Sequence, residues 1–239
     1  RWVEREFDPR VAEAHARHPG VDPIIGRLLA SRGARMGETA AFLAPRLKDQ
    51  MPDPSILRDM DKAVELVLAA LLDGRKTVVF ADYDVDGGVS AAQLIRYFRG
   101  WGRELGLYVP DRLKEGYGPS PGAFRTLHEQ GVKLIIAVDC GANSRAALEE
   151  AKTLGVEVIV LDHHLMAHGA PPEAAALVNP NRPDCNSGLG YLAAAGVVFM
   201  LMVAVNRVAR ARGLFQERAE PDVMKLLDRG QTTDGMPLS

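Results

Sequence analysis

The chain has 239 residues, of which 47% are hydrophobic and 25% are charged. This balance is typical of a soluble globular protein with one full core, and it excludes a disordered chain or a collagen-like repeat. The formal net charge is -2, so the field of the whole molecule does not attract nucleic acid. A nucleic-acid partner would need a local basic groove.

The apolar runs and the cysteines bear on where the protein works. Runs such as residues 133–139 and 156–161 are interrupted by charge after four to six residues, whereas a membrane-spanning helix needs roughly 20. We therefore expect no membrane span. Only two cysteines, Cys140 and Cys185, are present, which indicates a reducing compartment and predicts a cytoplasmic protein. The chain opens on Arg1 without an apolar leader, and we expect it to be a fragment of a longer chain.

Helical patterns without strand signals occupy the first part of the chain. Short apolar-periodic stretches at residues 11–17, 23–31 and 38–43 are separated by glycine and proline. The pattern changes at residue 61. We therefore expect a small helical N-terminal region over residues 1–60 and a second domain over residues 61–239.

Helices and strands alternate along that second domain. The pattern predicts helices at residues 61–72, 90–101, 121–130, 144–154 and 191–212. It predicts strands at residues 77–80, 105–109, 132–138, 156–161 and 174–178. The strands are Val, Ile and Leu runs without polar alternation, which indicates burial on both faces. We therefore predict an α/β fold with an open, mostly parallel, Rossmann-like sheet and helices on both faces.

Carboxylates and imidazoles follow three of the predicted strands. They are Asp82, Asp84 and Asp86 after the first strand, Asp139 after the third, and Asp162, His163 and His164 after the fourth. In an open parallel sheet the carboxyl ends of the strands share one edge, where ligands bind. Carboxylates at this density would repel one another unless cations lie between them, and an Asp-rich site with histidine suits Mn²⁺ or Mg²⁺. The ligands suffice for two ions, which about 3.5–4 Å apart activate water against a phosphoester.

Other interpretations apply to parts of this edge. An aspartate after a strand is often only a helix cap. Cys140, beside Asp139, could serve as a thiolate ligand or nucleophile, but no base is implied next to it and we expect it in the core. Residues 82–87 also fit the first half of a calcium-binding EF-hand loop. Its twelfth position would be Gln93 instead of glutamate, and a strand precedes it where an EF-hand needs a helix.

The ordered motifs resemble those of the DHH phosphoesterase superfamily. They are Asp82-Tyr-Asp-Val-Asp-Gly87, Val138-Asp-Cys-Gly141 and Asp162-His-His164. Further segments resemble the N-terminal part of the bacterial single-stranded-DNA-specific exonucleases of that superfamily, at residues 28–33, 42–45, 53–60, 110–118, 178–180 and 195–198. The resemblance runs from near residue 20 to about residue 212.

The resemblance implies a two-metal hydrolase that degrades single-stranded DNA from the 5′ end in recombination and repair. It implies metal binding, by Mn²⁺ or Mg²⁺, at Asp82, Asp84, Asp86, Asp139 and His163. Catalytic roles fall on Asp84, on Asp139, which would bridge the ions, and on His164, which would stand beside the scissile phosphate. A single-strand-binding protein is a candidate partner, and the oligomeric state is left open.

The C-terminal end departs from the family pattern. Asp234 aligns with a fourth aspartate motif, but the segment between Asp228 and Asp234 is shorter and polar. We expect this end to be atypical or truncated, and the second, substrate-binding domain to be absent. The alternatives are a DHH phosphoesterase acting on short oligonucleotides or cyclic dinucleotides, and a non-catalytic nucleic-acid-binding scaffold.

A loop after the second predicted strand is the expected substrate path. Arg112, Tyr117 and Gly118 lie there, on the same edge as the metal ligands. A guanidinium can grip a phosphate and a tyrosine can stack on a base. The plainer interpretation is a solvated loop in which Lys114 pairs with Glu115 or faces water.

Overall fold

The computed structural model describes residues 3–166, 169–216 and 218–225. The chain divides into two compact units, Arg1–Asp53 and Pro54–Ser239. The first unit ends before residue 60 because the short helix η1 (Pro54–Ile56) contacts helices of the second unit.

The first unit is helical, as predicted. Its helices are α1 (Pro9–Ala16), α2 (Pro23–Ser31), α3 (Thr39–Leu43) and α4 (Leu47–Gln50). The sequence pattern did not predict α4. The fully buried His15 joins α1 to α3, since its Nδ1 lies 2.8 Å from Oγ1 of Thr39 and its Nε2 lies 3.1 Å from the carbonyl oxygen of Ala34. His15 is therefore a packing residue.

The second unit is built on a five-stranded sheet in the order β2-β1-β3-β4-β5, and every pair of neighbours is parallel. The strands are β1 (Thr77–Ala81), β2 (Gly106–Tyr108), β3 (Leu134–Val138), β4 (Glu157–Leu161) and β5 (Ala176–Val178). The predicted α/β fold is confirmed. The chain leaves β1 for β2 on one side and returns to β3 on the other, which creates a switch point between β1 and β3.

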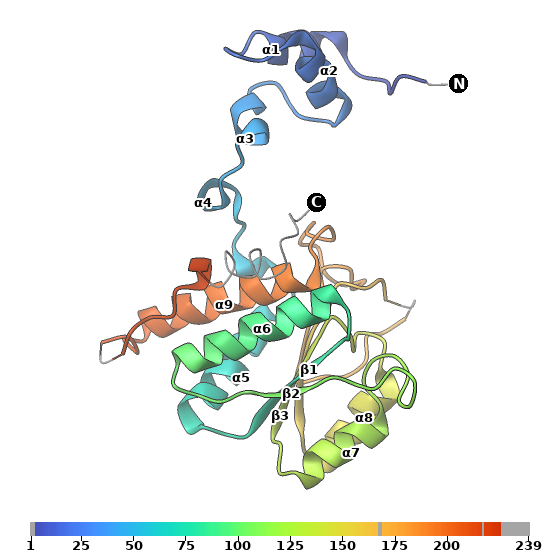
Figure 1. Ribbon diagram of the computed structural model, residues 1–239, viewed down its shortest axis with the longest axis vertical. Coiled ribbons are helices and arrows are strands. Elements are labelled where there is room, and N and C mark those ends of the chain that lie inside the picture. Colours follow the sequence, from blue (N-terminus) through green and yellow to red (C-terminus); the bar gives the residue numbers. More distant parts are fainter. Residues whose placement is uncertain (1–2, 167–168, 217, 226–239) are drawn as a thin grey trace. The chain divides into compact units, whose positions relative to one another are not determined.

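Helices cover both faces of this sheet (Figure 1). One face carries α5 (Met60–Asp73), α6 (Val85–Gly100) and α9 (Ala194–Ala211), and the other carries α7 (Pro121–Glu129) and α8 (Arg145–Leu154). Phe80 and Ile135 of the sheet pack with Phe124 of α7 and Leu148 of α8 in one buried cluster. Burial of each such side chain stabilises the fold by about 1.5–3 kcal/mol.

The long helix α9 is more apolar than the sequence runs suggested. Its 18 residues have a mean hydropathy of 1.5. By length and composition it could cross a membrane, and it is the one such helix among the described residues. In the structure 61% of it is buried, against α5, α6 and β4. The expectation that apolar runs end after four to six residues was wrong for this helix, whose apolar side chains pack in the core.

Helix α6 begins earlier than predicted, at Val85 and not near Ser90. Asp84 is its N-cap and accepts a hydrogen bond from the backbone N–H of Gly87 at 3.0 Å. A Cβ at Gly87 would lie 2.4 Å from the carbonyl oxygen of Asp82, so only glycine lets the helix start this close to β1. Gly87 therefore permits the close packing of α6 against β1, whereas a Cβ at Gly88 would meet nothing within 4 Å.

Candidate metal centre

Four polar residues form a row across the sheet, one position beyond the strand ends: Asp82, Asp139, Asp162 and Asn179. The last residues of β1, β3, β4 and β5 are paired with one another in register. The backbone N–H groups of the three aspartates extend this ladder, each donating to the neighbouring strand at 3.3, 3.0 and 3.1 Å. The row lies at the switch point, where ligands bind in such sheets.

The first motif lies between β1 and the first turn of α6. Asp82 accepts a hydrogen bond from the N–H of Tyr83 at 2.8 Å, and burial together with the charge of Asp84 raises the pKa of Asp82. For Asp84, burial acts in the same direction and is the largest single effect, but the N–H of Gly87, a hydrogen bond from Asp139 in its protonated form and the nearby His164 together outweigh it, so the pKa of Asp84 is lowered. Asp84 is therefore a helix cap and remains charged.

Asp86 faces a different helix. Its two carboxylate oxygens accept hydrogen bonds from the N–H groups of Ala194 and Ala195, at 2.8 and 2.9 Å. The residue before α9, Ala193, has no side chain that could cap the helix. Asp86 thus caps α9 from a distance and neutralises its N-terminal dipole.

Asp139 is the central carboxylate of the row. Its side chain is 1% exposed, and neither oxygen receives a hydrogen bond from any described residue. Burial, followed by the charges of Asp86 and Asp84, raises the pKa of Asp139 to about 8. Its backbone is left-handed, with a φ of 58°, which is uncommon outside glycine and is seen at functional sites. A buried carboxylate without a donor is what a bound cation would complete.

The two histidines differ in orientation. Nε2 of His163 points toward the carboxylates, 3.3 Å from Oδ1 of Asp139 and 3.5 Å from Oδ2 of Asp86. Nδ1 of His164 lies 2.7 Å from Oδ1 of Asp162, which also accepts the backbone N–H groups of both histidines. Because Asp162 can only accept, Nδ1 of His164 carries the proton and Nε2 is left to face the site.

Two groups of side chains offer ligand atoms that all lie within 4.8 Å of one another. They are Asp82, Asp84 and Asp139 in one group, and Asp139, His163 and His164 in the other. Asp139 belongs to both, which suits a carboxylate shared by two ions. Asp86 is close but belongs to neither group, and Asp234 lies outside the described residues. Oxygen and imidazole donors without thiolate fit Mn²⁺ or Mg²⁺.

This arrangement is unlike an EF-hand. Asp82 follows a buried strand, and Asp86 and Gln93 lie within α6, where Gln93 is buried. A calcium loop needs its last ligand in an exiting helix and all ligands around one ion. Cys140 is buried, and its thiol donates to the carbonyl oxygen of Val138 at 3.3 Å, so it is a core residue as expected.

The loop after β2 reaches the rim of the carboxylate cluster. The guanidinium of Arg112 lies over the ring of Tyr83, 5.0 Å from its centroid. The hydroxyl of Tyr117 lies 3.4 Å from the carbonyl oxygen of Asp139 and 3.5 Å from Nε2 of His164. Gly118 adopts a left-handed φ of 71°, which turns the chain back toward α7. These positions place the predicted substrate residues beside the cluster.

Lys114 of that loop faces water, as the plainer interpretation allowed, since its side chain is 82% exposed. Its ammonium pairs with Asp111, at 3.3 Å, and not with Glu115. Glu115 instead accepts hydrogen bonds from the Tyr108 hydroxyl at 2.5 Å and from the N–H of Asp111 at 2.8 Å. The three-residue spacing within a turn brings Lys114 back toward Asp111.

The sequence pattern did not single out two residues that shape the site, Asn179 and Asn181, and it did not show the task of a third. Asp162 is a carboxylate of the edge, as expected, but it orients His164. Asn179 and Asn181 donate to the backbone of the two histidines. The position of Asn179 directly after a predicted strand, level with Asp162, was the signal that could have found it. No sequence pattern indicated the contact of Tyr83 with Arg112.

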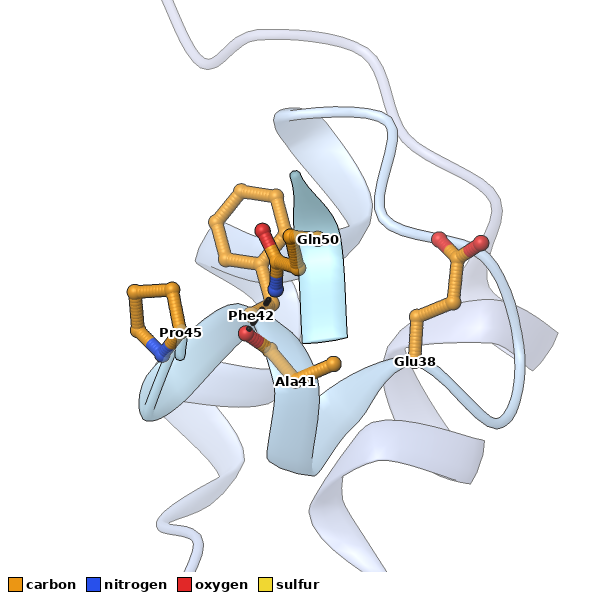
Figure 2. A pocket seen from close by; sticks show the side chains of 5 residues that line it. All are labelled: Glu38, Ala41, Phe42, Pro45 and Gln50. Carbon is orange, nitrogen blue, oxygen red and sulfur yellow. Dashed lines mark hydrogen bonds between the residues drawn. The ribbon is translucent and has the colours of Figure 1, made fainter. Parts of the chain in front are cut away.

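Figure 2 shows a pocket elsewhere, in the N-terminal unit, lined by Glu38, Ala41, Phe42, Pro45 and Gln50. The amide of Gln50 donates to the carbonyl oxygen of Ala41 at 2.9 Å, and one oxygen of Glu38 accepts from the N–H of Arg35. The lining offers a single carboxylate. It is therefore not a second metal centre.

Comparison with known proteins gives consistent matches. A family model described as "DHH family, N-terminal domain" matches residues 76–228. The "Single-stranded-DNA-specific exonuclease RecJ" of Escherichia coli (strain K12) is 39% identical over 222 residues, which are 90% of this chain and 38% of that protein. The chain thus spans less than half the length of this relative.

Two solved structures are similar as well. "Crystal structure of exonuclease RecJ bound to manganese" is 32% identical, with a TM-score of 0.60 over 74% of this chain and 43% of that one. A crystal structure of RecJ from Thermus thermophilus in complex with Mn²⁺ is 27% identical, with a TM-score of 0.69 over 97% of this chain and 31% of that one.

Proposed function

The chain belongs to the DHH family, and on that premise we propose that it carries the metal-dependent phosphoesterase domain of a single-stranded-DNA exonuclease. The activity would be phosphodiester hydrolysis from the 5′ end. The observation that supports this most strongly is Asp139, a buried carboxylate that lacks a hydrogen-bond donor among the described residues and belongs to both ligand groups. The relatives named as RecJ, two of them in structures that contain manganese, point the same way.

We assign the metal ligands as Asp82, Asp84, Asp86, Asp139 and His163, with Asp234 as a further ligand outside the described residues. Two Mn²⁺ or Mg²⁺ ions held there would activate a water and offset charge on the phosphate oxygens. Asp139 would hold both ions. Asp86 would serve twice, since its oxygens already cap α9 and retain lone pairs toward His163.

His164 would act on the scissile phosphate. Asp162 holds its Nδ1–H at 2.7 Å and so fixes the ring, leaving Nε2 on the solvent side of the cluster. A ring held this way can donate a proton from Nε2 or, when charged on both nitrogens, stabilise negative charge on the pentacovalent state. The Tyr117 hydroxyl, 3.5 Å away, marks the side from which the phosphate would enter.

Arg112, Tyr117 and Gly118 would contact the DNA strand. The position of the Arg112 guanidinium over Tyr83, next to Asp82, supports a contact with a phosphate at the cluster. The exposed ring of Tyr117 offers a surface for a base. Arg112 would supply local positive charge for the strand, which the overall charge of -2 does not provide.

The wider assignments follow from the same proposal. We propose that the second unit, which begins at Pro54 and contains the expected domain of residues 61–239, is the phosphoesterase domain. The helical unit before it accounts for most of the expected region of residues 1–60. The protein would act in the cytoplasm in DNA recombination and repair. Single-stranded DNA would be its substrate, and a single-strand-binding protein is a candidate partner.

One assay tests the proposal directly. The whole protein is incubated with 5′-labelled single-stranded DNA, with and without Mn²⁺, beside the same strand as a duplex and as RNA. We expect Mn²⁺-dependent release of labelled mononucleotides from the single strand alone. Hydrolysis of only dinucleotides or cyclic dinucleotides would indicate another DHH phosphoesterase, and no hydrolysis with intact DNA binding would indicate a scaffold.

A further inference from the structure

Two asparagines after β5 contact the backbone of the histidine pair. The amide of Asn179, which is fully buried, donates to the carbonyl oxygen of His164 at 2.9 Å. The amide of Asn181 donates to the carbonyl oxygen of His163 at 2.5 Å. The side-chain oxygen of Asn179 also accepts the N–H of Asn181 at 2.7 Å, so the two residues form one rigid unit. We call Asn179 and Asn181 the asparagine clamp.

The clamp completes the hydrogen bonding of the histidine backbone. The N–H groups of His163 and His164 are both bound by one oxygen of Asp162. Their carbonyl groups are both bound by the clamp. All four polar backbone groups of the pair are therefore held by side chains, at a point where β4 has already ended and the sheet no longer fixes the chain.

Holding both sides of two consecutive residues fixes their backbone angles, and with them the direction in which each imidazole leaves the chain. His163 needs that direction to keep Nε2 at 3.3 Å from Asp139. Its imidazole is 31% exposed, so packing alone does not hold it. The clamp is itself held, because the amide of Asn181 also donates to the carbonyl oxygen of Gly190, and a Cβ at Gly190 would lie 2.4 Å from Oδ1 of Asn181.

We propose that Asn179 and Asn181 are positioning residues that hold the histidine pair in its metal-binding orientation. This inference rests on the proposed metal centre. Neither asparagine needs to touch an ion or the DNA, and their amide groups act through the carbonyl groups of His163 and His164. Side chains that orient metal ligands typically contribute about 10–100-fold to metal affinity.

The chain offers a matched control for a purely structural effect. Asn206 is another buried asparagine, which accepts from the hydroxyl of Tyr97 at 2.7 Å and donates to the carbonyl oxygen of Pro221 at 2.8 Å. It lies twelve residues along α9 from Ala194, about 18 Å from the N-terminal end of that helix. Asn206→Ala removes a buried amide without touching the metal centre.

The experiment compares Asn179→Ala, Asn181→Ala and Asn206→Ala with the wild-type chain after all metal has been removed. Calorimetric titration with MnCl₂ gives the Kd, and hydrogen exchange gives the protection of the amides of His163 and His164. We expect both clamp variants to bind Mn²⁺ about 10–100-fold more weakly. We also expect the two histidine amides to exchange about fivefold faster or more, beyond any change seen in Asn206→Ala. Asn206→Ala should keep the wild-type Kd even if it melts earlier.

Three results would separate the possibilities. If a folded Asn181→Ala chain, whose altered side chain is only partly buried, keeps the wild-type Kd, the clamp does not position the metal ligands. If Asn206→Ala weakens Mn²⁺ binding as much as the clamp variants do, the effect is general loss of stability and the inference is again overturned. If the wild-type chain binds no Mn²⁺, the proposed metal centre is refuted. If, in addition, the amides of His163 and His164 exchange at the wild-type rate in the clamp variants, the asparagine clamp is refuted as well.

Discussion

Replacing Asp139 by asparagine should stabilise the metal-free chain while removing its metal binding. Burial raises the pKa of the Asp139 carboxyl from 3.8 to about 8, so the folded chain binds this proton more tightly than the unfolded chain does. The stability that the proton contributes is complete below about pH 4 and is lost as the pH rises toward 8. At pH 7 the loss is at most about 4 kcal/mol, since a tenfold change in proton affinity is about 1.4 kcal/mol.

Asparagine removes this penalty because it is neutral, has the same shape and tolerates the left-handed backbone that Asp139 adopts. In a chain of this size a change of about 4 kcal/mol corresponds to a rise of about 8–16 °C in Tm. The assay is thermal unfolding of both chains in a chelator at about pH 4, 5.5 and 7, values that lie between the two pKa values. The two curves should coincide at the lowest pH and separate as the pH rises. Added Mn²⁺ should then raise the free energy of unfolding of the wild-type chain by about 2.7 kcal/mol at a hundredfold excess over Kd, and its Tm should rise accordingly. The Tm of Asp139→Asn should not change.

Equal stability of the two metal-free chains at neutral pH would refute this reasoning, because it would mean that the buried carboxyl finds a donor in solution. In the whole protein, Asp139→Asn and Asp139→Ala should both abolish Mn²⁺-dependent hydrolysis with the fold intact. Unchanged turnover in either variant would contradict the two-metal assignment.

Three further outcomes are expected. Calorimetric titration of the chain should show tighter binding of Mn²⁺ than of Ca²⁺, because His163 offers an imidazole nitrogen that Ca²⁺ uses poorly, and the reverse order would revive a calcium site. In the whole protein, Arg112→Ala should raise KM for single-stranded DNA and make KM less dependent on salt, while the affinity for Mn²⁺ stays the same. If KM and its salt dependence stay at wild-type values, the DNA strand enters the site by another route. Gly87→Ala should lower the free energy of unfolding by about 1–3 kcal/mol, because the new Cβ meets the backbone of Asp82. The neighbouring Gly88→Ala should raise the free energy of unfolding by about 0.5–1 kcal/mol, because its Cβ meets nothing within 4 Å. Equal urea midpoints for the two variants would show that α6 shifts to make room.

Much of the fold could be predicted from the sequence because its signals are local. Short apolar runs rich in Ile and Val, such as residues 134–138, favour buried strands, and glycine or proline separates them from amphipathic helices. Alternation of the two then leaves little choice but a parallel sheet. The same logic places Asp82 and Asp139 at one edge, since each follows a strand directly. The sequence did not predict the start of α6, because glycine can either break a helix or, as Gly87 does here, allow a helix to pack closely against a strand.

The direction of each side chain at that edge was decided only by tertiary structure. Register between strands that are far apart in sequence sets Asp82, Asp139, Asp162 and Asn179 in one row, and no local pattern encodes register. The sequence therefore predicts a group of carboxylates but not their separate tasks. Asp86 caps α9, more than a hundred residues away, and Asp162 orients His164 because the neighbouring backbone N–H groups draw its oxygens inward. Asp139 alone of these aspartates has both oxygens without a donor among the described residues, because the packing around β3 brings carboxylates and an imidazole, but no backbone N–H group, to its side chain.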